Sequence, residues 1–432
     1  VLDTVLFRGL RVTRARSILR ELTLVPGDTL TVAEARRQAR RSAELAYNTG
    51  LFNFARAVLR FAPPQAPGGP LRLHVAFDVQ ERWYITPEGV FRVEEQTMAE
   101  WLKNPTLARL TYGLGLSWRN ITGRNDRARI FFTLGYTRSL SLSYGLPFFD
   151  TRRGLGLGLG LGLSENNEAI YGTQGDSILR LRLPGGQAVA RRYGASIGLS
   201  KRITQNRGAD FSVGFTALWA ADSLRRLAPG FLPALGSVEP ASAGAIAGQR
   251  YLRYPTLGAA LWWDTRDVRA FPLRGTRAEA SLLLAGAGLG NASFAIVDAR
   301  WFHFAPTPLR RVYIAYGGRA IAALGGQLPF QAKPQLGFVP LRGFEARFIE
   351  GQVVAAAKTE LRLELLRRRL VSWRWLPKVF RQFAFGAYPY LFFDAGTVLD
   401  SSPFQTERRY KDRLLTGWGI GIDIPHFYDN VF

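Results

Sequence analysis

The chain contains no cysteine and only three histidines among its 432 residues. Without cysteine it has no disulfide framework, no thiolate metal site and no cysteine nucleophile. The histidines, His74, His303 and His426, lie far apart in the sequence, which disfavours a multi-histidine metal centre. The sequence therefore predicts neither a metal ion nor a cofactor.

Long hydrophobic runs are also missing. Charged residues, or clusters of Gly and Pro, interrupt every stretch before it reaches the roughly 20 apolar residues that a membrane-spanning helix needs. This excludes a helical membrane protein. The chain starts at Val1 without the charged and apolar segments of an export signal, so such a signal is either absent or already removed.

The first 83 residues predict a compact α+β unit. The segment from Thr31 to Asn48 has its apolar residues on one helical face, and Thr31 is a suitable N-cap. Thr13 is the expected N-cap of a shorter helix before it. The expected order is strand, helix, helix, strand, strand, at residues 1–7, 13–22, 31–48, 54–61 and 71–79.

From residue 84 onwards, alternation with a period of two residues replaces the helical pattern. Leucines from Leu155 to Leu163 alternate with glycines, so one face of this strand is all leucine and the other has no side chains. Alternating segments of about ten residues are typical of a transmembrane antiparallel β-barrel, so a mostly β fold with a barrel over residues 84–432 is predicted. Similar segments recur at 110–118, 128–136, 192–200, 211–218, 257–263, 277–284, 294–304, 312–321, 358–366, 383–393 and 414–424.

Aromatic residues cluster near the ends of these segments, as in Trp262-Trp263, Trp301-Phe302 and Phe392-Phe393. Such clusters are expected where a barrel meets the two membrane interfaces. The connections are unequal as well, because those at 221–249 and 323–355 are long and several others are short turns. A soluble sandwich or propeller is the alternative, but these two features favour a membrane barrel.

The net charge of +24 comes from 57 Lys and Arg against 33 Asp and Glu. These cations are dispersed at turns, as in Arg152-Arg153 and Arg310-Arg311, and form no compact basic platform with aromatic residues. Nucleic acid is therefore not an expected partner. Dispersed cations at strand ends favour contact with anionic lipid headgroups or lipopolysaccharide phosphates.

Four short motifs stand where predicted elements meet. Tyr47-Asn48-Thr49-Gly50-Leu51-Phe52 ends the second helix, and the segment Asn120 to Asp126 follows an early barrel strand. Leu341-Arg342-Gly343-Phe344 stands in the long connection at 323–355. The fourth motif consists of Asp264, Arg266, Asp267, Pro272 and Gly275, in the middle of the barrel region. Together these motifs resemble those of the Omp85 superfamily, outer-membrane assembly and secretion barrels that carry periplasmic POTRA domains.

The resemblance implies one POTRA domain at residues 1–83 in the periplasm and a barrel at 84–432 in the bacterial outer membrane. Protein-inserting members usually carry more than one POTRA domain, and only one fits before Trp83. About sixteen barrel strands are implied, whereas roughly fourteen are recognisable. Because only seven residues follow Pro425, the natural chain is expected to continue beyond Phe432.

The resemblance further implies that the loop around 323–355 folds into the barrel lumen, where Glu360 and Asp394 hold Arg342. A guanidinium group can pair with one carboxylate through two hydrogen bonds while donating to a second one. Gly343 permits a sharp turn of the backbone, and Phe344 can wedge against the barrel wall. These residues form the candidate lock of the loop.

For function, the resemblance implies an insertase or translocase that is not an enzyme. Unfolded or secreted client proteins would add a strand to the POTRA sheet and use the seam between the first and last barrel strands. Whether periplasmic or lipoprotein accessory subunits are required stays open. The alternative function is a passive channel, a lipid-transport barrel or a structural barrel within a larger complex. Gly194-Ala195-Ser196-Ile197-Gly198 matches a serine hydrolase pattern, but it lies in an alternating strand with no helix after it.

Overall fold

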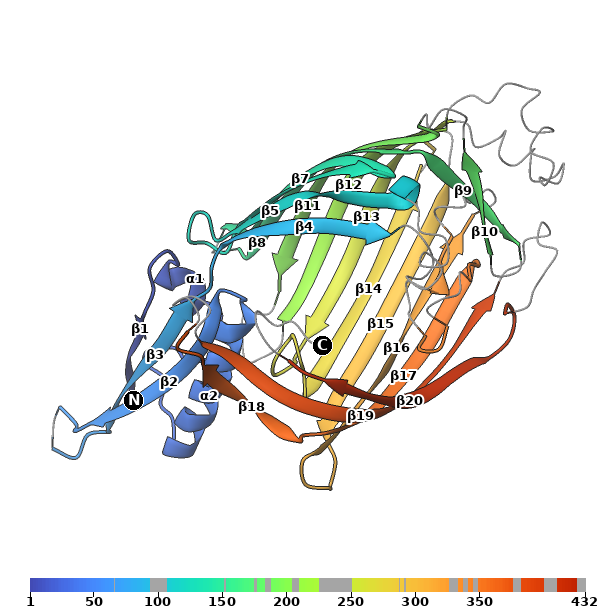
Figure 1. Cartoon of the computed structure of the whole chain (residues 1–432). Coiled ribbons are helices and arrows are strands. Elements are labelled where there is room, and N and C mark those ends of the chain that lie inside the picture. The colour runs from blue at the N-terminus through green and yellow to red at the C-terminus, as the bar shows by residue number, and fades with distance from the viewer. Residues whose placement is uncertain are drawn as a thin grey trace, which may run out of the picture.

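The computed structural model describes most of the chain in one arrangement, a small N-terminal unit beside one end of a large curved sheet (Figure 1). No helix within the described residues has the length and hydrophobicity needed to cross a membrane. The described residues are 1–65, 67–93, 107–150, 153–174, 177–182, 188–203, 210–224, 251–286, 288–290, 293–325, 333–336, 341–344, 349–375, 382–399 and 410–425.

The N-terminal unit has the predicted order of elements. Its sheet has the order β1-β3-β2, in which β1 runs parallel and β2 antiparallel to β3. Ala35, Ala39 and Ala46 of the second helix pack on this sheet in one buried core. The elements are β1 (Leu2–Arg8), α1 (Ala15–Leu19), α2 (Val32–Asn48), β2 (Phe52–Ala62) and β3 (Arg72–Glu81).

The two predicted helix caps have different outcomes. Thr31 caps α2 through a capping box with Glu34, in which each side chain bonds the backbone N–H of the other residue. The prediction for Thr13 was wrong, because α1 begins at Ala15 with Arg14 at its N-cap and no side-chain cap. The Thr13 hydroxyl lies 2.8 Å from the Tyr84 hydroxyl instead, at the junction with the barrel.

The large sheet contains 15 antiparallel strands within the described residues, and it curves into a barrel wall (Figure 1). Its edge strands are β4 and β20, which are not paired with each other in the described part of the chain. Residues 426–432 lie outside the described residues, so the expected sixteen strands stay a prediction. The strands are β4 (Ile85–Val93), β5 (Leu110–Arg119), β6 (Arg127–Gly135), β7 (Thr137–Asp150), β8 (Leu155–Asn166), β11 (Ala190–Arg202), β12 (Asp210–Leu224), β13 (Tyr251–Asp264), β14 (Gly275–Ala285), β15 (Phe294–Pro306), β16 (Val312–Leu324), β17 (Val353–Leu363), β18 (Leu366–Ser372), β19 (Gln382–Leu399) and β20 (Leu415–Asp423).

Two features modify this regular wall. Strand β18 continues the line of β17, since both pair with β19 and the intervening Leu365 donates its N–H to the carbonyl of Ala387. Beyond β8, a separate hairpin of β9 (Glu168–Gln174) and β10 (Ser177–Arg182) precedes β11. The long connection at 221–249, predicted from its length, lies mostly outside the described residues.

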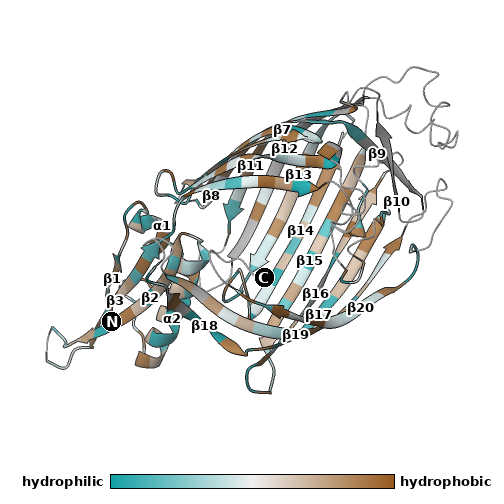
Figure 2. Ribbon diagram, in the orientation of Figure 1, coloured by the Kyte–Doolittle hydropathy of each residue, from teal (hydrophilic) through white to brown (hydrophobic). Residues whose placement is uncertain are grey.

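The leucine face of β8 points away from the barrel interior. Leu159, Leu161 and Leu163 are 45%, 59% and 48% exposed, whereas the alternating glycines lie on the inner face. Figure 2 shows the same alternation of hydrophobic and less hydrophobic residues along β14, β15 and β16. An apolar exterior of this kind suits the hydrocarbon of a membrane rather than water.

In the pairs Trp301-Phe302 and Phe392-Phe393 only one residue belongs to the outer surface. Trp301 and Phe393 are about half exposed outside, while Phe302 and Phe392 lie on the inner face. There the Phe302 and Phe392 rings cover Gly317 and Gly419 on the neighbouring strands, where a Cβ atom would collide with them. The reason is the two-residue period of a strand, and a ring over a cross-strand glycine fills the missing side-chain volume.

Turns at one end of the barrel, here called the proximal end, hold the N-terminal unit. The backbone N–H of Arg14 donates to the carbonyl of Gly123 in the β5–β6 turn, at 3.0 Å. The Asn48 amide at the end of α2 donates to the carbonyl of Asp267 in the β13–β14 turn, at 2.8 Å. These contacts, with an Arg202–Glu21 ion pair of 2.7 Å, attach the unit at separate points around the rim.

The outward leucine face leads to a test of orientation. We expect Leu161→Arg to destabilise the barrel by about 2–4 kcal/mol in a phospholipid bilayer, because it places a charge in the hydrocarbon. Equilibrium unfolding in bilayers measures this, and Leu161→Ala is the matched control with a much smaller loss. Equal stability of the two variants would contradict an outward-facing leucine.

Candidate functional site: an arginine lock in the barrel lumen

The connection between β16 and β17, here called the inner loop, folds back against the inner wall of the barrel. Leu336, Leu341 and Ile349 of this loop are almost completely buried. They pack on wall residues, among them Val354 of β17 and Val398 of β19. Burial of these apolar side chains places the following Arg342 on the inner face of the late barrel strands.

Arg342 is held by two carboxylates on two different strands. Its Nε and Nη2 donate to Oδ2 and Oδ1 of Asp394 on β19, at 2.7 and 2.6 Å, while Nη1 donates to Oε1 of Glu360 on β17, at 2.7 Å. Asp394 is fully buried, and the side chains of Arg342 and Glu360 are 19% and 15% exposed. The structure thus brings together the three charged residues singled out in the sequence.

Aromatic rings and a second arginine complete this network. The Arg342 guanidinium lies 3.8 Å from the centre of the Phe392 ring, a cation–π contact. Arg362 donates to Oε2 of Glu360 at 2.9 and 2.6 Å, so Glu360 bridges two arginines. Arg362 also donates to the carbonyl of Pro272 at 3.2 Å, which connects the network with the β13–β14 turn.

The two residues after Arg342 shape the turn of the loop. Gly343 has a φ angle of +93°, which side chains rarely allow, and the Phe344 N–H donates to the carbonyl of Leu341 at 3.0 Å. The Phe344 ring meets the Tyr410 ring edge to face, with centres 6.1 Å apart. Tyr410 precedes β20, so Phe344 contacts the connection into that strand.

Two further residues, absent from the sequence-based prediction, tie the inner loop to β20 and to the connection that precedes it. Gly417 faces the backbone of Arg342 so closely that a Cβ atom at 417 would overlap the Arg342 carbonyl oxygen. Lys411 donates to Glu350 at 3.1 Å, and both side chains are almost fully buried. The Gly417 requirement arises from a tertiary contact, so no local sequence signal could identify it among 45 glycines.

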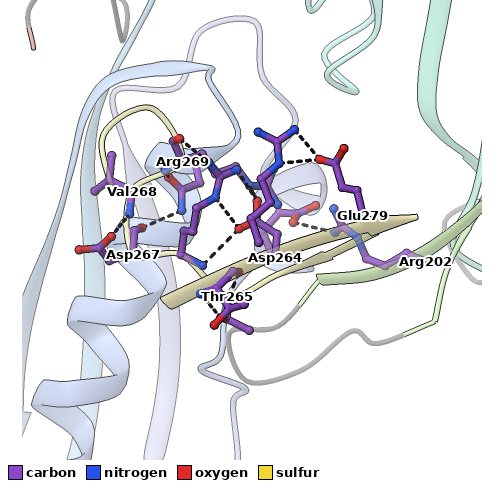
Figure 3. Close-up of polar contacts among 12 residues, drawn as sticks. Arg202, Asp264, Thr265, Asp267, Val268, Arg269 and Glu279 are labelled. Carbon is purple, nitrogen blue, oxygen red and sulfur yellow. Dashed lines mark hydrogen bonds and ion pairs between the residues drawn. The ribbon is translucent and has the colours of Figure 1, made fainter. Parts of the chain in front are cut away.

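The mid-barrel motif forms the turn between β13 and β14 (Figure 3). Arg266 pairs with Asp264 through two bonds of 2.8 Å, and Oδ1 of Asp267 accepts the N–H groups of Val268 and Leu273. Gly275, with a φ of +101°, leaves no room for a Cβ beside the Thr265 carbonyl. This motif therefore builds a rigid turn, on which α2 docks.

Pro272 and its neighbour Phe271 are buried where the turn meets the late strands. The Phe271 ring centre lies 4.5 Å from that of Tyr388 on β19 and 4.8 Å from the Arg362 guanidinium. No group of three or more His, Asp or Glu side chains that could hold a metal ion occurs among the described residues.

A curved antiparallel sheet with an apolar exterior, a charged interior and a folded-in loop defines this protein as a transmembrane β-barrel. A sequence model of the Omp85 superfamily domain matches residues 120–426, and the chain therefore belongs to the Omp85 superfamily, a group of bacterial outer-membrane barrels. No curated protein sequence matches the chain.

Solved structures with the same fold cover 98% of this chain. CdiB from Escherichia coli has a TM-score of 0.56 and 13% identity, with 69% of that chain covered. BamA from Haemophilus ducreyi lacking POTRA domains 1–3 has a TM-score of 0.50 and 15% identity, with 78% covered. CdiB from Acinetobacter baumannii has a TM-score of 0.51 and 12% identity, with 67% covered. At these identities the similarity concerns the fold alone.

The lock leads to a prediction about coupled charges. Arg342→Ala should destabilise the barrel by about 3 kcal/mol, because it leaves the buried Asp394 without its two guanidinium bonds. Asp394→Asn alone should also destabilise it, whereas the double variant should recover part of the loss. Unfolding temperatures of the four proteins in detergent measure this coupling, and simple additivity of the single effects would contradict the lock.

Gly417 leads to a steric prediction. Gly417→Ala should lower the unfolding temperature and increase protease cleavage of the inner loop, since the added methyl group displaces the Arg342 carbonyl. Gly162→Ala on β8 is the matched control, because a Cβ there meets nothing within 4 Å. Equal behaviour of the two variants would exclude close packing of β20 on the loop.

Proposed function

We propose that this protein is an outer-membrane insertase or translocase for client polypeptides and that it carries out no catalytic chemistry. The observation that supports this most strongly is membership of the Omp85 superfamily combined with an inner loop that is attached to the strands beside one barrel edge. Residues 1–83 act in this proposal as a POTRA domain in the periplasm, and residues 84–432 as the membrane barrel.

The route of a client follows from the positions of the sheet edges. Strand β2 is an edge of the N-terminal sheet and lies beside β19 at the proximal end (Figure 1). A client segment that adds to β2 by backbone hydrogen bonds would be presented next to β19 and to its partner β20. The open edge of β20 could then template an incoming strand.

The lock gives this edge its mechanical support. Arg342 links the inner loop to β17 and β19, and its backbone packs on β20, so the loop braces the strands on one side of the seam. In this proposal the β4 side moves relative to a fixed β20 side.

A passive channel or lipid-transport barrel is the second candidate, favoured by the polar inner wall. There Arg319 pairs with Asp298, and Arg300 pairs with Glu279, at 2.6 and 2.9 Å. Paired charges on an inner wall keep a lumen hydrated and suit conduction. Persistent ion conductance of the purified barrel in planar bilayers, with no client affected by deletion of residues 1–82, would favour this candidate.

Depletion of the protein in its native host, followed by quantitative proteomics of the outer membrane and the medium, tests the proposal. Loss of many barrels is expected for an insertase and loss of one exported protein for a dedicated translocase. When expressed in the depleted host, the Arg342→Ala variant should reach the outer membrane but restore few of the lost client proteins. Leu161→Ala is the control variant, which should restore them. An unchanged protein inventory after depletion would contradict the proposal.

A further inference from the structure

A cleft of about 430 Å³ lies at the proximal end, between α2, the β13–β14 turn, β16 and the β17–β18 line. Tyr313 of β16 lines this cleft and lies at an even separation from Arg319, so it belongs to the inner face of the wall. The cleft therefore opens at the mouth of the barrel, next to the N-terminal unit. No residue of the lumen lock lines it.

In the described part of the chain, three arginines at this cleft lack the carboxylate partners that arginines on the inner face of the barrel wall have. Arg40 of α2, Arg274 of the turn and Arg367 of β18 are exposed, and within the described residues none of them forms an ion pair or a side-chain hydrogen bond. Arg319 and Arg342, by contrast, are held by carboxylates. Three guanidinium groups from three separate elements thus line one cleft without a direct ion pair within the described residues.

The acidic residues of the cleft offset its arginines only in part, because five arginines and three carboxylates line it and an excess of two positive charges remains. Glu44 pairs with Arg41 at 3.2 Å, and Glu364 accepts the Tyr313 hydroxyl at 3.1 Å. Asp267 accepts backbone N–H groups within its own turn. The positive charge of this rim therefore arises because the fold brings arginines of separate elements to one cleft, and not from the net charge of the chain alone.

The remaining lining favours a peptide over a small inorganic anion. Val268 and Leu273, which are partly exposed, supply an apolar surface beside the cationic rim, and the almost completely buried Phe271 and Tyr388 also line the cleft. A polypeptide segment that carries a carboxylate would use both parts, whereas phosphate would use the rim only. We propose that this cleft binds a carboxylate of the client polypeptide at the mouth of the barrel; this inference rests on the proposed function.

Direct binding to the purified full chain in uncharged detergent tests the site. The probes are three fluorescein-labelled peptides: one with two Glu residues and an amidated end, its Gln counterpart with a free terminal carboxylate, and the amidated Gln peptide. Fluorescence anisotropy should show binding of at least one acidic peptide and much weaker binding of the neutral one. The comparison of the two acidic peptides identifies a side-chain or a terminal carboxylate as the preferred group.

The triple variant Arg40→Gln, Arg274→Gln, Arg367→Gln should bind the preferred acidic peptide about tenfold more weakly, with a smaller salt dependence. The matched control replaces Arg36, Arg369 and Arg374, which are exposed and do not line the cleft, so it has the same net charge. It should bind as the parent protein does. An unfolding temperature equal to that of the parent establishes that both variants are folded.

Unchanged binding by the triple variant, or an equal loss in the control, would overturn the proposal. Displacement of the peptide by an equimolar concentration of inorganic phosphate would also overturn it, since the cleft would then be a site for small anions. Because this assay involves no transport, its outcome is separate from the depletion experiment. A carboxylate site found in a protein whose depletion affects no client would reject the proposed function and retain the site.

Discussion

The Arg342 guanidinium, shared between Asp394 and Glu360, is the interaction on which the position of the inner loop depends. The apolar residues of the loop pack on β17 and β19, and the guanidinium adds directed hydrogen bonds to a carboxylate on each of these strands. Asp394 is buried, and loss of its guanidinium partner would leave an uncompensated charge in the protein interior. The pairing therefore fixes the loop against β17 and β19, and this in turn brings the Arg342 carbonyl against Gly417 of β20.

The lock is also connected in space to the N-terminal unit. Arg362 bonds Glu360 on one side and the Pro272 carbonyl on the other, and the turn that contains Pro272 accepts the Asn48 amide of α2 through Asp267. Contacts thus run without a gap from the inner loop to the first domain. Energetic coupling along this path would show as non-additive effects of substitutions at its two ends.

The two ends of this path have different chemistry. In the lumen, arginines are matched by carboxylates and aromatic rings, so the charges serve the structure. At the mouth, Arg40, Arg274 and Arg367 have no such partners within the described residues. Under the proposed function, this excess of positive charge at the entrance would attract an anionic segment toward the barrel.

Local patterns in the sequence were sufficient for the mostly β fold, the order of elements in the N-terminal unit, the N-cap at Thr31 and the all-leucine face of β8. These follow from strand and helix periods and from short-range capping, which involve residues close in the chain. The resemblance to Omp85 motifs singled out Arg342, Glu360 and Asp394, which the fold brings together. Only the tertiary structure decided that Phe302 and Phe392 face inward beside Trp301 and Phe393, and that Thr13 bonds Tyr84 rather than capping a helix. It also decided that Gly417 packs on the Arg342 backbone and that arginines from three elements line one cleft. Those features depend on register and on contacts between residues far apart in the chain, which no local pattern encodes.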